Sequence, residues 1–74
     1  MNNNIYTAVA DGTNVKVFNA LNGIHIMTRN IGYQILTCVC AGDVLSITVQ
    51  ISPHTRYAYT YKLPHFNQIS AYSL

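Results

Sequence analysis

The sequence predicts an all-β fold, an antiparallel meander of about seven short strands, on three observations. Turn residues divide the 74-residue chain at short, even intervals. The segments between the turns are rich in Val, Ile, Thr and Tyr, which favour strands. None of these segments has apolar residues at helical spacing over the length of a helix. Because the connections are short, successive strands are expected to pair antiparallel.

Each strand is expected where an alternating segment lies between two turns. The expected strands are residues 5–10, 13–20, 24–31, 34–41, 44–51, 56–63 and 68–74. In the fifth, Leu45, Ile47, Val49 and Ile51 alternate with more polar residues, so this face should enter a core. The fourth is apolar on both faces, with Leu36, Cys38 and Cys40 opposite Ile35, Thr37 and Val39. We therefore expect it to be the innermost strand.

Residues 11–23, DGTNVKVFNALNG, combine an Asp-Gly turn, an alternating strand, an aromatic and amide pair, and an Asn-Gly turn. This order resembles the third-strand region of a WD-type β-propeller blade, with Phe18-Asn19 where that family has Trp-Asp. The resemblance implies blade-like turn and core roles for Asp11, Gly12, Phe18, Asn19, Asn22 and Gly23.

A weak internal repeat supports the same interpretation. A shift of 43 residues aligns residues 14–31 with 57–74, so that Phe18 meets Tyr61 and Ile26 meets Ile69. A four-stranded blade needs a period of about 40 to 45 residues. We therefore expect one all-β domain over residues 1–74, formed by two blade-like units at 5–31 and 34–74. The alternative is a small β-sandwich or barrel with similar hairpins.

The composition indicates a surface that is covered in the working protein. Only 8% of the residues are charged and half are apolar, whereas ordinary domains carry about 25% charged residues. We expect the chain to bury this surface against copies of itself or other assembly subunits; the alternative is a neutral monomer with a Ser, Thr and Asn surface. The net charge of +2 is spread along the chain, so nucleic acid is not an expected partner.

Groups that could carry a reaction are scarce. The two carboxylates, Asp11 and Asp43, each adjoin a glycine in a predicted turn, and the chain has no Glu. No local pattern places a Ser or Cys nucleophile beside a His. The sequence therefore predicts a protein that is not an enzyme and has no cofactor.

Cys38 and Cys40 lie on the same face of their predicted strand and are expected to be reduced core thiols, which favours an intracellular or virion location. A metal site would need histidines such as His25, His54 or His65 to join them, and zinc sites usually take two separated ligand pairs. We expect no metal. The start of the chain, MNNN, does not have the basic and apolar regions of a secretory signal. No segment is apolar enough to predict a membrane span.

The most suggestive cluster is RYAYTYK, residues 56–62. Tyr57, Tyr59 and Tyr61 share one strand face, and Arg56 and Lys62 lie on the other. Such a row suits sheet packing, a protein contact, a sugar ring or a stacked base. Because the basic face favours solvent, we expect the tyrosines to face protein.

Together these features predict a structural assembly component, with a virus particle as one setting for it. The alternative is a small oligomeric lectin-like module, in which the same tyrosines, or Tyr33 and Tyr72, stack on carbohydrate.

Overall fold

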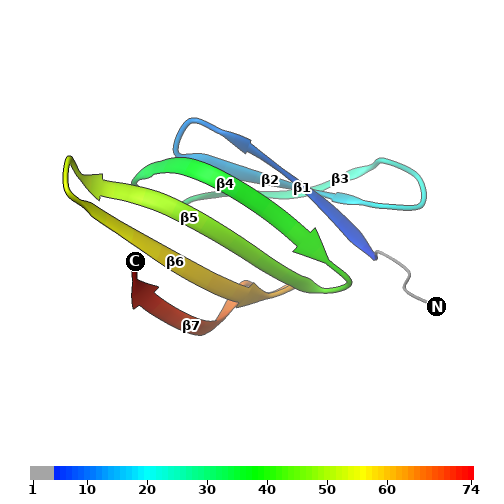
Figure 1. Ribbon diagram of the computed structural model, residues 1–74. Helices are drawn as coiled ribbons and strands as arrows, with labels where there is room; N and C mark the ends of the chain where they lie inside the picture. The colour runs from blue at the N-terminus through cyan, green and yellow to red at the C-terminus, as the bar shows by residue number, and fades with distance from the viewer. Residues whose placement is uncertain (1–4) are drawn as a thin grey trace.

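The computed structural model describes residues 5–74, and these form seven antiparallel strands with no helix (Figure 1). The predicted all-β fold is confirmed, and each strand begins and ends within one residue of its predicted position. The strands are β1 (Tyr6–Asp11), β2 (Asn14–Asn19), β3 (His25–Asn30), β4 (Gln34–Ala41), β5 (Val44–Ser52), β6 (Thr55–Lys62) and β7 (Asn67–Ser73).

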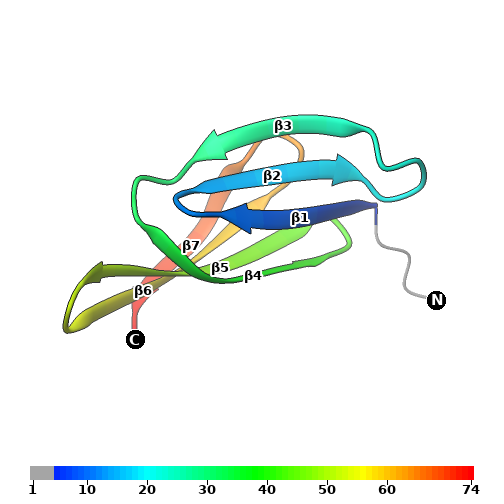
Figure 2. The same ribbon diagram turned by 90° about the horizontal axis from the view of Figure 1, so that it is seen from above.

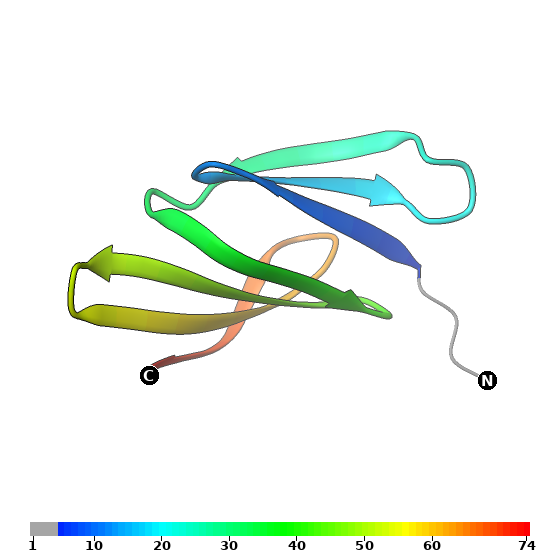
Figure 3. The ribbon, with the colours of Figure 1, turned by 45° about the horizontal axis from the view of Figure 1, so that its top comes forward.

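The strands form two sheets that are not closed into a barrel. One has the order β1-β2-β3 and the other the order β4-β5-β6-β7, so neighbours in sequence pair within each sheet, whereas β3 and β4 do not pair. The chain passes from the first sheet to the second between Asn30 and Gln34. The three-stranded sheet lies over the four-stranded sheet, with the strand directions crossing (Figures 2 and 3). We call the two facing surfaces the inner faces and the other two the outer faces.

The core lies between the inner faces. Val15 and Val17 of β2 are fully buried, and so is the β5 stripe of Leu45, Ile47 and Val49. This confirms the predicted core-facing stripe of β5; Ile51, at its end, is half-buried. The remaining buried side chains are Ile35, Leu63 and Phe66. Apolar side chains in both sheets thus meet because each strand alternates with a period of two.

The prediction that residues 34–41 form the innermost strand is wrong. β4 is the first strand of its sheet and pairs only with β5, while β1 lies beside it through a hydrogen bond from the Ile35 amide to the Gly12 carbonyl (3.1 Å). A β-bulge separates Ile35 from Thr37 in the register. The bulge puts Ile35 on the inner face with the cysteines and leaves Leu36 43% exposed. An extra residue in the ladder, which alternation alone cannot reveal, changed the predicted faces.

Two of the predicted turns differ in length. The pair Asp11 and Asn14 closes a two-residue turn in which Gly12 adopts a φ of 64°, a conformation that glycine reaches without strain. Asn22 and Gly23 instead lie inside the longer loop of residues 20–24. There the Asn19 side chain accepts a hydrogen bond from the Leu21 amide (2.8 Å). Side-chain acceptance of this kind stabilises the wider loop.

Candidate interaction surfaces

Tyr57, Tyr59 and Tyr61, here called the tyrosine row, lie on the inner face of β6. The register sets them directly across from the buried Val49, Ile47 and Leu45 of β5, respectively. All three tyrosines are half-buried and pack against the core. Neighbouring ring centroids are 6.1 Å apart along the whole row. The row therefore forms part of the wall of the core and also has an exposed side.

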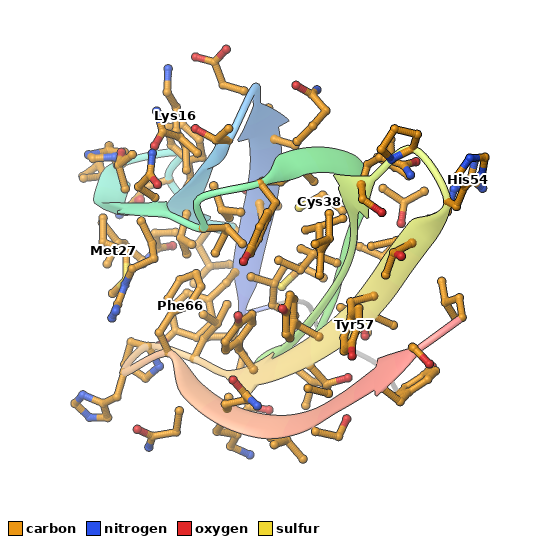
Figure 4. All side chains as sticks on the ribbon, turned by 90° about the vertical axis from the view of Figure 1, so that its left-hand side faces the viewer. Lys16, Met27, Cys38, His54, Tyr57 and Phe66 are labelled. Atoms are coloured by element: carbon orange, nitrogen blue, oxygen red, sulfur yellow. The ribbon has the colours of Figure 1, made fainter. Side chains whose placement is uncertain are left out.

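Phe66 and Arg29 extend the row toward the three-stranded sheet. The Phe66 ring lies 5.1 Å from that of Tyr61, and the guanidinium carbon of Arg29 lies 5.0 Å from the Phe66 centroid. Phe66 is only 7% exposed, although it lies in the β6–β7 loop. Its backbone φ is 60°. Burial raises the pKa of Tyr61 above its ordinary value. Figure 4 shows Phe66 between the two sheets, near Met27.

Coverage of the four-stranded sheet decreases from β5 to β7. Leu45, Ile47 and Val49 of β5 are fully buried. The tyrosine row on β6 is half-buried, and every residue of β7 is exposed. Figure 4 shows β7 at the far side of its sheet from the three-stranded sheet. Three strands cannot cover four of similar length, so the inner face of β7 lies beyond the cover.

The basic side chains of β6 lie on the outer face, as expected. Arg56 donates from Nε to the Gln50 side chain (3.1 Å). Lys62 forms an ion pair with Asp43 at 2.7 Å. Both basic residues are exposed, so the two faces of β6 are separated into a basic outer side and an aromatic inner side.

The two carboxylates are far apart and each pairs with a lysine. The β1–β2 turn beside Asp11 lies near the start of β4, where the Ile35 amide donates to the Gly12 carbonyl, and the turn that holds Asp43 follows the end of β4 (Figure 1). Asp11 forms an ion pair with Lys16 at 3.4 Å. A hydrogen bond from the Lys62 side chain lowers the pKa of Asp43 below its ordinary value. Asp11 and Asp43 are therefore not brought together, and each forms an ion pair with a lysine of its own sheet.

Cys38 and Cys40 are free thiols on the inner face of β4, opposite Ile47 and Leu45 in the register. Both are half-buried, and burial raises the pKa of each thiol, mainly by making the thiolate costly. Within residues 5–74, no group of three or more His, Cys, Asp and Glu side chains could hold a metal ion. His25 bonds the Thr28 hydroxyl (2.8 Å).

Phe18 lies on the outer face of the three-stranded sheet. It follows the buried Val17 and packs edge-on against His25, with ring centroids 5.5 Å apart. The ring is half-buried and does not belong to the core between the sheets. Asn22 accepts a hydrogen bond from the Ile24 amide (3.0 Å). The residues implied by the blade resemblance thus serve turns and one outer-face aromatic contact.

Three features were missed by the sequence analysis. Alternation identifies inner residues only within strands, so it could not show that Phe66, in the β6–β7 loop, is buried. The long-range contact of Arg29 with Phe66 has no local sequence pattern. The exposure of β7 was also missed, because its composition resembles that of the buried strands.

In the part of the chain that the structure describes, no helix is long and apolar enough to cross a membrane. No family model matches this sequence, and no curated protein or solved structure is significantly similar to it.

Proposed function

We propose that this chain is a non-enzymatic structural subunit that associates with copies of itself or packs into a larger assembly, such as a virus particle. The observation that carries the proposal is the exposure of β7, the edge strand of the four-stranded sheet, in which Ile69 is 55% exposed and Tyr72 is 56% exposed. Leu74, just after the strand, is 68% exposed. Exposed apolar side chains gathered on one element are typical of interaction surfaces.

The charges support the same proposal. Both carboxylates already pair with lysines of their own chain, which favours a contact between copies that rests on apolar burial and backbone hydrogen bonds. Interface cores are depleted in charged residues and enriched in tyrosine. A sequence with 8% charged residues and six tyrosines has the composition that such a contact needs.

Native mass spectrometry of the full chain over a series of protein concentrations tests this function. The expected result is a set of oligomer ions that increases with concentration, because association follows mass action. A spectrum of monomer alone throughout the series contradicts self-association.

The alternative is a small carbohydrate-binding module, favoured by the exposed side of the tyrosine row. Sugar rings stack on flat aromatic faces, and the rings of Tyr57 and Tyr59 are stacked with an interplanar angle of 28°. A glycan array run with the wild type, Tyr59→Ala and the conservative control Tyr59→Phe separates the functions. Saturable binding that is lost in Tyr59→Ala and kept in Tyr59→Phe, with the fold intact, favours the lectin-like module.

A further inference from the structure

Of the four sheet edges, β7 is the least protected against another strand. The edges of β1 and β4 lie beside each other and are joined by the hydrogen bond between Ile35 and Gly12. The edge of β3 carries Arg29. Residues 63–74, which include β7, contain no Asp, Glu, Lys or Arg, and β7 itself contains no Pro. Natural sheets usually block their edges with such residues, so β7 is open to pairing.

The backbone of β7 presents donors to this open edge. The Leu74 amide donates to the Arg56 carbonyl (2.9 Å), and Tyr72 is opposite Ala58 in the same register. In an antiparallel ladder the amides alternate in direction. The amide of Tyr72 therefore points toward β6, and those of Ala71 and Ser73 point away from it. Another strand could bond to these two amides without disturbing the β6–β7 ladder.

From these observations we infer that β7 pairs antiparallel with β7 of a second copy, so that two four-stranded sheets join into one continuous sheet. The inference rests on the proposed function and names the surface that performs it. In a two-fold contact both copies use the same surface, and residues near the axis lie close to their own equivalents, so like charges would repel there. Residues 63–74, which contain no Asp, Glu, Lys or Arg side chain, tolerate this arrangement best. The β3 edge would instead place the Arg29 of both copies in one contact.

The size of the contact determines the affinity to expect. A seven-residue strand is about 23 Å long. Pairing along it covers less than the roughly 800 Å² per partner of a standard interface, from a total exposed surface of 4643 Å². Ile69, Tyr72 and Leu74 add apolar area beside the paired backbones. The dimer is therefore of the weak class, and its formation should be followed up to high protein concentration.

Amide hydrogen exchange of the full ¹⁵N-labelled chain, measured by NMR at low and high protein concentration, tests the pairing residue by residue. The Ala71 and Ser73 amides should exchange at least about tenfold more slowly at high concentration, because they are bonded only in the dimer. The Thr28 amide is the internal control. The Ile31 amide donates to Thr13, so alternation points the Thr28 amide to the β3 edge. It should exchange at the same rate at both concentrations.

The matched variants are Ala71→Pro and Thr28→Pro, each of which removes one outward amide from an edge. Ala71→Pro should raise the dimer dissociation constant at least about tenfold, since the symmetric contact loses two donors. Thr28→Pro should leave it unchanged. If Ala71→Pro loses the near-ultraviolet circular dichroism of the folded chain, Ser73→Lys replaces it as the test of the β7 pairing. Two lysines near the two-fold axis of the β7 contact should also raise the dimer dissociation constant about tenfold or more.

The outcomes separate this inference from the function on which it rests. Dimers with fast Ala71 and Ser73 amides at high concentration overturn the β7 pairing and leave self-association in place. Normal dimerisation of a folded Ala71→Pro or Ser73→Lys chain also overturns the pairing. A chain that remains monomeric at every concentration overturns the proposed function itself.

Discussion

Arg29 of β3 and Phe66 of the β6–β7 loop join the two sheets, with the guanidinium carbon 5.0 Å from the ring centroid. Phe66 in turn lies against Tyr61, so the contact continues into the tyrosine row. The pair connects the last strand of the three-stranded sheet with the second half of the four-stranded sheet. The Arg29–Phe66 pair lies where the three-stranded sheet ceases to cover the inner face of the four-stranded sheet.

Replacing Arg29 by Met should lower the free energy of unfolding by about 0.5–1 kcal/mol, the value of a partly exposed cation–π contact. Arg56→Met is the matched control because Arg56 contacts a polar side chain on the outer face. Urea unfolding followed by circular dichroism measures both variants. Equal losses in the two variants would contradict a stabilising role for the contact of Arg29 with Phe66.

Ile47→Ala and Ile69→Ala compare a buried with an exposed isoleucine. Ile47 is 1% exposed and Ile69 is 55% exposed. Ile47→Ala should cost about 2–5 kcal/mol of unfolding free energy because it leaves a cavity, and Ile69→Ala less than about 0.5 kcal/mol. The measurement is thermal and urea unfolding at low protein concentration. A large loss for Ile69→Ala there would show that β7 is covered within the monomer.

Tyr59→Ala and Tyr72→Ala compare the inner and outer aromatic positions. Tyr59 packs against the core between two neighbouring rings, so its loss should destabilise the fold by about 2 kcal/mol. Tyr72 is 56% exposed on the edge strand, and its loss should reduce association with little effect on the monomer. Unfolding curves combined with light scattering distinguish the two effects. The reverse assignment would place the interaction surface on the tyrosine row.

Cys38 and Cys40 should react slowly with iodoacetamide in the folded chain. Burial raises the pKa values of both thiols, and only the thiolate reacts. The rate of alkylation should therefore rise at higher pH in the folded chain than in the unfolded chain, whose thiols have an ordinary pKa of about 8.5. Mass spectrometry of the single variants Cys38→Ser and Cys40→Ser follows each remaining thiol. Rates equal to those in urea would contradict the burial.

Acid should remove the contribution of the Asp43–Lys62 ion pair. The pKa of Asp43 is lowered in the folded chain, mainly by the hydrogen bond from Lys62. Its stabilisation is therefore present above the ordinary carboxyl pKa of about 3.9 and is lost as the pH falls through the lower folded value. Wild type should lose more stability than Asp43→Asn over that window. In Asp11→Asn, which removes a longer and more exposed ion pair, the acid loss should stay close to that of wild type.

The sequence contained enough information for the strands and for the antiparallel pairing of neighbours within each sheet, but not for the division into two sheets or the place of β4. Turns and alternation located all seven strands and the β5 core stripe, because both depend on residues close together in the chain. The bulge after Ile35 changed which residues of β4 face the core. The position of β4 at the edge of its sheet depends on its contact with the β1–β2 hairpin, and no local sequence pattern indicates that contact. The tyrosine row was found from its alternation, whereas its extension by Phe66 and Arg29 required the three-dimensional contact.

Sedimentation velocity of the wild-type chain, from low micromolar to submillimolar concentration, tests self-association most directly. The predicted result is a sedimentation coefficient that rises with concentration from that of an 8.2 kDa monomer toward that of a dimer or larger oligomer, as mass action requires. A single coefficient of a folded monomer, constant over the whole range, would contradict the account.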